Sequence, residues 1–303
     1  MIGSRAYKDL AKLFQQSLGA GTPPDLSRAS DYEKFVVRHR LALSPTIDGL
    51  DCSLERWDSL RIHSLTEPLS THSGVPALFA MFNVLKSDFL AARYLAYQAL
   101  SKSFPDSGLY FDTLDYAVYG VVPSILSLAQ RACIDVLDKI AVATSEYFAI
   151  PGSEKLVYFS NRWFDANNAE AREWHPSLLR EIQAGNTAVV ALAELSLDVK
   201  KGGALHQKKA YRDASTHRFT VLHDIGCKPS RPSAYIQHCG LAEFKYQLVE
   251  SLQLARAAVL YFVEMVSVRE TFNKPTAGRV GVLGVPTYHW IRGTSEESAS
   301  HSR

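Results

Sequence analysis

Two long segments of this chain carry an apolar residue at every third or fourth position, and this period constrains the fold more than any other feature. Residues at that spacing share one face of an α-helix, and an apolar face must be buried against other elements. The pattern predicts two long core helices. Their apolar positions are Leu78, Phe82, Leu85, Phe89, Ala92, Ala96 and Leu100 in the first, and Leu241, Phe244, Leu248, Leu252, Ala255, Val259, Phe262 and Val266 in the second.

Further helices are predicted from weaker periods and from Pro and Gly stops. We expect helices at 4–18, at 31–43 before Pro45, across 110–148 with Pro123 as a kink or a division, and at 176–199. These segments leave little room for a sheet. The predicted fold class is therefore all-α, an elongated helical bundle with an N-terminal helical extension and irregular loops. We expect three parts: an N-terminal helix and loop (1–30), the helical domain (31–273) and a partly disordered tail (274–303).

Composition limits the classes of protein that this chain can represent. Its 303 residues are 47% hydrophobic and 21% charged, as in a globular protein with a sizeable core. A formal charge of +2 is too small for a general nucleic-acid coat, although it allows a local basic site. The N-terminal residues show no apolar signal core, and we find no apolar run of about 18 residues. The lack of such a run predicts that the protein does not act in a membrane, and four cysteines without paired spacing predict a reducing cytoplasm.

The stretch from Ala204 to Asp224 holds the best candidates for chemistry, because Arg212, Asp213 and His217 fall within six positions. In a helix, a residue advances by about 100°, so Asp213 and His217 share a face on which a carboxylate can orient an imidazole. Arg212 and His217 diverge by about 140° on the same wheel. A site that uses both is easiest to build where two copies of this segment meet.

Three basic residues are further candidates for contact with a phosphate. Lys86 and Arg93 lie seven positions apart on one side of the first core helix, and Lys209 lies just before Arg212. We expect these three side chains to bind the substrate, with Arg212, Asp213 and His217 as the catalytic group.

The sequence Arg-Asp-Ala-Ser-Thr-His at 212–217 resembles the Arg-x4-6-His signature of the HEPN ribonucleases. The segments at 82–100 and 31–49 resemble the first core helix of a larger bacterial HEPN subgroup and the residues before it. Asp213 stands where the family often has asparagine. The resemblance implies a HEPN-like all-helical domain, usually dimeric, whose paired motifs form a metal-independent RNA-cleaving site in toxin–antitoxin or antiviral defence systems. It implies RNA and an antitoxin or defence protein as partners, and no cofactor.

The residue chemistry is compatible with that activity. In RNA the neighbouring 2′-hydroxyl is an internal nucleophile, so an enzyme needs only proton transfer and stabilisation of the crowded phosphate. His217 can move the proton and Arg212 can hold two phosphate oxygens. Products would carry a 2′,3′-cyclic phosphate and a 5′-hydroxyl.

Two other interpretations remain open. A non-catalytic HEPN scaffold would bind RNA, a nucleotide or a protein partner without cleavage. A zinc protein would draw its ligands from five residues, although no Cys-x-x-Cys pair occurs and neighbouring His and Cys residues cannot readily bind one ion. Those five residues are His217, His223, Cys227, His238 and Cys239.

Overall fold

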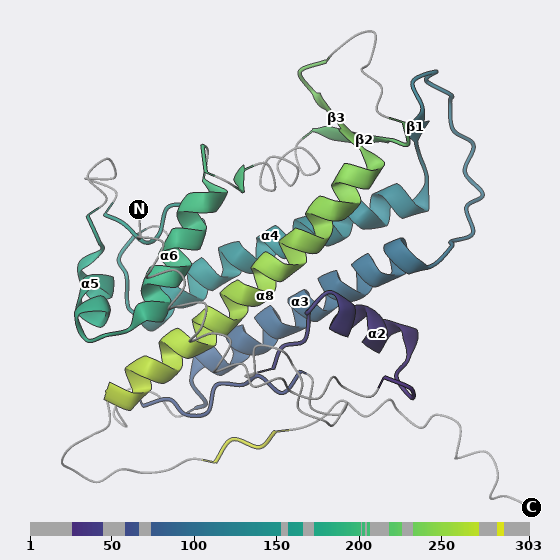
Figure 1. Cartoon of the computed structure of the whole chain (residues 1–303). Coiled ribbons are helices and arrows are strands. Elements are labelled where there is room, and N and C mark those ends of the chain that lie inside the picture. The colour runs from purple at the N-terminus through teal and green to yellow at the C-terminus, as the bar shows by residue number, and fades with distance from the viewer. Residues whose placement is uncertain are drawn as a thin grey trace, which may run out of the picture.

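The structure is a computed structural model that describes residues 26–44, 58–66, 74–152, 157–165, 173–200, 202–203, 205–206, 218–225, 233–272 and 284–287. Helices hold more than half of these residues (Figure 1). The predicted helical character of the chain is thus confirmed. The helices are α2 (Asp31–Arg38), α3 (Ala77–Ser101), α4 (Val121–Tyr147), α5 (Pro176–Gln183), α6 (Thr187–Val199) and α8 (Leu241–Phe272).

The core lies between the long helices α3, α4 and α8, with α6 packed against α8 (Figure 1). Both helices predicted from apolar period are present, as α3 and α8. The residues predicted to face the core are buried in α3, among them Leu78, Phe82, Leu85, Phe89 and Ala92. Their spacing of three and four residues places them on one stripe, which α4 and α8 cover.

The helix α8 contacts α3, α4 and α6, and it buries Phe244, Leu248, Leu252, Val259 and Phe262. By length and composition alone it is long and apolar enough to cross a membrane. More than half of its most apolar window is buried inside the protein, however, as in the core helix of a globular domain. Its apolar character is accounted for by the helices around it.

Several predicted helix boundaries were wrong. The region predicted as helical from 110 begins only at Val121, and Pro123 lies in the first turn of α4, where its missing N–H leaves no hydrogen bond unmade. The helix predicted over 176–199 is divided into α5 and α6. Gly185 lies in the break with a φ of +94°, a conformation that favours glycine.

The helix α2 is shorter than predicted and begins differently. Ser30, rather than Asp31, is its N-cap: the Ser30 hydroxyl accepts from the N–H of Glu33, whose carboxylate accepts from the N–H of Ser30. The helix ends at Arg38, well before Pro45. Arg40 follows with a φ of +55°, which turns the chain out of the helical path.

A small sheet corrects the all-α prediction. It contains β1 (Ala117–Val118), β2 (Phe219–His223) and β3 (Ile236–Gly240) in that order, with β1 antiparallel and β3 parallel to β2. The helical geometry considered for the stretch 204–224 does not hold over its last part, because residues 219–223 form β2. The residues at 219–222, Phe-Thr-Val-Leu, are aromatic, β-branched or apolar, and such side chains suit a pleated strand that is half buried. The sheet lies at the ends of α4 and α8 (Figure 1).

Two predicted segments fall outside the described residues. They are the N-terminal helix at 4–18 and nearly all of the tail from 274, of which only 284–287 is described. The three-part division of the chain therefore stays a prediction.

Arg93, a predicted phosphate ligand, forms a buried ion pair with Asp58. Its two terminal nitrogens donate to the Asp58 carboxylate at 2.9 and 2.7 Å, and one of them also donates to the carbonyl of Leu41 at 2.9 Å. Its Nε donates to the Tyr32 hydroxyl at 2.8 Å. With 3% of its surface exposed, Arg93 links α3 to the segments at 26–44 and 58–66. These contacts give it a structural role.

Lys86 is engaged in the same place, because its ammonium group donates to the backbone carbonyls of Asp58 and Leu60. Burial alone would raise the pKa of Asp58, but the hydrogen bonds and charge of Arg93 outweigh it and lower that pKa below its usual value. Asp58 therefore stays ionised at neutral pH. Its stabilising effect is present above the unfolded pKa and is lost as pH falls through the lower folded pKa.

We predict that Asp58→Ala destabilises the protein much more than Asp88→Ala. The first change leaves the Arg93 guanidinium buried and unpaired, at a cost of about 3–5 kcal/mol. The second removes a half-exposed pair with Lys139, which is worth about 1 kcal/mol or less. Urea unfolding of both variants measures the difference. Equal losses of unfolding free energy would contradict a structural role for the Arg93 pair.

Candidate functional site

The predicted catalytic segment lies between described parts of the chain. Lys209, Arg212, Asp213 and His217 are themselves outside the described residues, so their arrangement stays a prediction. The description resumes at Arg218, and β2 begins at Phe219. His217 thus precedes the first residue of β2 by two positions. Consecutive Cα atoms are about 3.8 Å apart, so the two residues are close together along the chain. The pairing of β2 with β1 and β3 therefore fixes the position of the chain immediately after the motif.

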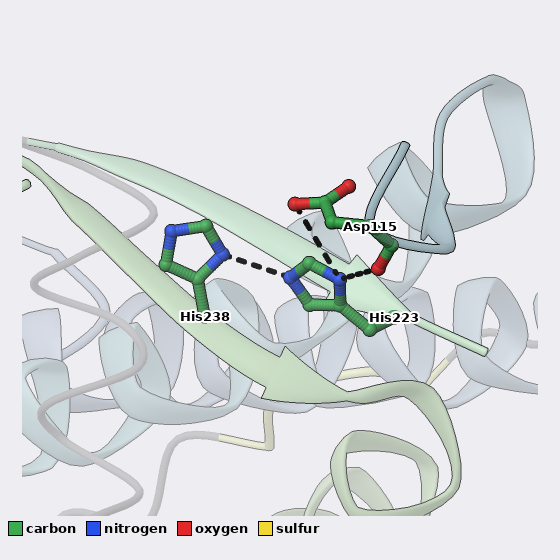
Figure 2. Close-up of side chains that lie close together, drawn as sticks. All are labelled: Asp115, His223 and His238. Carbon is green, nitrogen blue, oxygen red and sulfur yellow. Dashed lines mark hydrogen bonds and ion pairs between the residues drawn. The ribbon is translucent and has the colours of Figure 1, made fainter. Parts of the chain in front are cut away.

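Three side chains meet on one face of the sheet (Figure 2). His223 is the last residue of β2, and His238 is the third residue of β3. In the parallel register Val221 is opposite His238 and Gly240 is opposite His223, so the histidines are diagonal neighbours on the same face. Asp115 reaches them from the loop before β1. One ligand atom from each of the three residues lies within 4.8 Å of the others.

A directed chain of hydrogen bonds runs through this cluster. The Nδ1 atom of His223 lies 2.8 Å from the backbone carbonyl of Asp115, and its Nε2 atom lies 2.8 Å from Nδ1 of His238. A carbonyl oxygen can only accept, so neutral His223 carries its proton on Nδ1 and presents a lone pair at Nε2. Neutral His238 then donates from Nδ1 and keeps a lone pair on its own Nε2.

The electrostatic surroundings favour a neutral His238 imidazole and an ionised Asp115 carboxylate. Burial and then the neighbouring His223 lower the pKa of His238, while Asp115 opposes that effect. The hydrogen bond from the Thr113 hydroxyl lowers the pKa of Asp115. The nearer carboxylate oxygen of Asp115 lies 3.9 Å from Nδ1 of His223. The cluster therefore combines two nitrogen lone pairs with one nearby negative charge.

The structure separates the residues that were considered as zinc ligands. It brings His223 and His238 together, whereas the neighbouring Cys239 is on the opposite face of β3, 8% exposed and packed into the core. Its thiol donates to the Gly240 carbonyl at 3.4 Å. His217 and Cys227 lie outside the described residues. Because His238 and Cys239 point to opposite faces of β3, they do not readily bind the same ion, as their adjacent positions predict.

Asp115 was missed by the sequence analysis, and no local signal would have found it. It is separated from His223 by 108 positions and lies in a region that was predicted to be helical. The antiparallel pairing of Ala117 with His223 brings it to the cluster. Only knowledge of that pairing places the three side chains together.

Lys86 and Arg93, the predicted phosphate ligands on α3, are not part of this cluster. Their donors are used by backbone carbonyls, Asp58 and Tyr32. Arg218 directly follows the motif and is exposed, and two exposed aromatic side chains lie at the start of the parallel strand pair: Phe219 is 70% exposed and Tyr235 is 74% exposed. The Phe219 N–H donates to the Tyr235 carbonyl at 3.0 Å, so the two residues are held next to each other at the start of the parallel pair.

We predict that His223 is protonated on Nδ1 and unprotonated on Nε2 at a pH at which both rings are neutral. Nitrogen-15 NMR of histidine-labelled protein distinguishes the two tautomers, and a His238→Ala variant assigns the signals. Protonation of His223 on Nε2 would contradict the hydrogen bond to the Asp115 carbonyl.

Comparison with known families gives one match. A family model described as LA2681-like HEPN matches residues 69–269, about two thirds of the chain. The matched span includes α3, α4, the three strands and most of α8, and it also includes Arg212 and His217. Comparisons with curated proteins and with solved structures find no match.

Proposed function

The chain belongs to the LA2681-like HEPN family, and on that premise we propose that it is a metal-independent endoribonuclease with Arg212 and His217 as its catalytic residues. The observation that carries the proposal is the Arg-x4-His motif inside the matched span. The family supports a role that involves RNA. The residue chemistry at 212–217 supports cleavage in particular.

The proposed reaction uses the 2′-hydroxyl of the nucleotide before the cleaved bond. His217 takes the proton from that hydroxyl, the oxygen attacks phosphorus, and the 5′-oxygen leaves after it gains a proton from solvent or from a second acid. Arg212 stabilises the negative charge that develops on the phosphate oxygens. Asp213 orients His217 or Arg212, and Lys209 adds positive charge for the backbone of the RNA.

The exposed aromatic residues beside the motif support single-stranded RNA as the substrate class. Phe219 and Tyr235 present their rings to solvent at the end of the sheet that is closest along the chain to His217. Unpaired bases stack on such rings, at about 1–3 kcal/mol for each base. A base held there would bring its neighbouring phosphates toward the motif segment.

A homodimer fits the proposal, because Arg212 and His217 would diverge if the motif is helical, and a second copy would then complete the cleft. We also propose that the protein acts in the cytoplasm as a toxin or antiviral effector that an antitoxin or defence partner controls. The alternative function is a HEPN scaffold that binds RNA or a protein without cleavage.

We expect His217→Ala and Arg212→Ala each to lower RNA cleavage by about 100-fold or more, because they remove proton transfer and charge stabilisation respectively. Cleavage of a labelled single-stranded RNA is measured for each variant, with light scattering for mass and circular dichroism for folding. His63→Ala is the matched control, since His63 is exposed and distant in sequence from the motif. A folded His217→Ala protein with wild-type cleavage would overturn the proposed site. Wild-type protein that binds RNA but never cleaves it would favour the scaffold.

We further expect RNA cleavage to persist after excess chelator, with 2′,3′-cyclic phosphate ends on the products. The nucleophile belongs to the RNA and the charge is met by a guanidinium, so no bound ion is needed for the chemical step. End-group analysis by mass spectrometry checks the products. Loss of cleavage that magnesium alone restores, with 3′-hydroxyl ends, would contradict this mechanism.

A further inference from the structure

We propose that His223 and His238 form a binding site for a divalent transition-metal ion of the zinc class. The backbone carbonyl of Asp115 orients the His223 ring, and its carboxylate supplies negative charge near the ion. The site is distinct from the proposed catalytic motif. It rests on three described side chains from two strands and one loop (Figure 2). The proposal concerns metal binding alone and holds whether or not the protein cleaves RNA.

The two histidine rings are nearly in the geometry needed to share one metal ion. Nε2 of His223 and Nδ1 of His238 are 2.8 Å apart and share a single proton. Two imidazole nitrogens bound to one tetrahedral zinc ion, each at about 2.0–2.1 Å from it, are separated by about 3.3 Å. A separation of the rings by about 0.5 Å therefore makes room for a zinc ion between the two nitrogens. Small rotations of the two side chains are enough for that change. The proton of His238 then moves from Nδ1 to Nε2 of this partly exposed ring, so that both ligands stay neutral imidazoles.

The tautomer of His223 also suits a metal ligand. Metal-binding histidines usually donate their other ring N–H to a carbonyl or carboxylate, which fixes the ring and makes its lone pair a better ligand. His223 already has this partner in the Asp115 carbonyl at 2.8 Å. The Asp115 carboxylate, at 3.9 Å from the same nitrogen, supplies negative charge near the ion. His223 is 1% exposed, so its ring is held in place before any ion arrives.

A metal ion can reach the two histidines from solvent. His238 is partly exposed on β3, an outer strand of the described sheet, so the ion has a path from solvent and water can complete its coordination. Neutral imidazole suits Zn²⁺, Cu²⁺ and Ni²⁺, whereas Mg²⁺ and Ca²⁺ prefer oxygen ligands. A site with two histidine ligands and one carboxylate behind them therefore favours Zn²⁺, Cu²⁺ or Ni²⁺ over Mg²⁺ and Ca²⁺.

The position of the ion suggests its effect. It would join β2 to β3 on the face that carries both histidines, and β2 begins two residues after His217. Metal binding would thus stiffen the strand that follows the motif. The ion would organise this end of the molecule and take no part in bond cleavage.

The test is titration of the full-length, chelator-treated protein with zinc chloride, followed by calorimetry in the absence of RNA. We expect one saturable site for each chain. His238→Ala should weaken zinc binding by at least about 10-fold, and Asp115→Asn should weaken it by about 10-fold through loss of the neighbouring charge. His238 is partly exposed, so its replacement should leave the helical circular dichroism spectrum unchanged.

Two matched variants control for other zinc ligands. His63→Ala changes an exposed histidine that is far from the sheet in sequence, and Cys239→Ser changes the thiol on the opposite face of β3. Both should bind zinc within about two-fold of the wild type, a change much smaller than the loss expected at a ligand. A wild-type protein without saturable zinc binding, or a folded His238→Ala variant with unchanged affinity, would overturn the proposal. Because no RNA is present, neither result bears on ribonuclease activity.

Discussion

The burial of α8 is the constraint on which the rest of the structure depends. This helix contacts α3, α4 and α6, so those three elements must surround it before any of them has a complete core. Its first residue, Leu241, follows the last residue of β3 without a linker. The position of β3, and of His238 on it, is therefore set by the packing of the central helix. In the same way only Tyr119 and Gly120 separate β1 from α4.

The sheet is consequently an extension of the helical core. β1 is tied to the start of α4 and β3 to the start of α8, and β2 is held between them. Leu222 and Cys239 anchor its inner face in the core. The opposite face keeps both histidines in a defined relation to each other. Since β2 begins two residues after His217, the sheet is next to the proposed catalytic segment along the chain.

Buried polar contacts fix the relative register of the core helices, a task that apolar packing alone does poorly. Gln130 on α4 donates to the Ser251 hydroxyl on α8 at 2.9 Å. Near the other end of α8, Glu270 accepts from the Tyr147 hydroxyl at 2.6 Å and from the N–H of Thr66 at 2.7 Å. Sliding α8 by one turn would leave these groups buried without partners, at a cost of about 1–3 kcal/mol for each.

The sequence was informative where structure is local and poor where it depends on distant partners. Seven regularly spaced apolar residues identify α3, because a helix of 25 residues repeats its pattern many times. A strand of two residues such as β1 has no period to detect, and it forms only because His223 and Leu222 pair with it. Arg93 shows the same limit. An arginine on a predicted helix suggests a solvent-facing cation, and only the fold reveals that Asp58 meets it in the core.

Metal-free RNA cleavage and a metal-binding histidine pair are compatible in one molecule, because they make different demands on imidazole. A catalytic histidine must gain and lose a proton during each turnover, so its nitrogen has to face the substrate. A metal ligand must keep its lone pair directed at the ion, and a fixed acceptor on its other nitrogen serves that purpose. His223 has such an acceptor and is almost fully buried, which suits it to the second task and not to the first. In the proposed mechanism, proton transfer is assigned to His217, which precedes β2 by two residues in the chain.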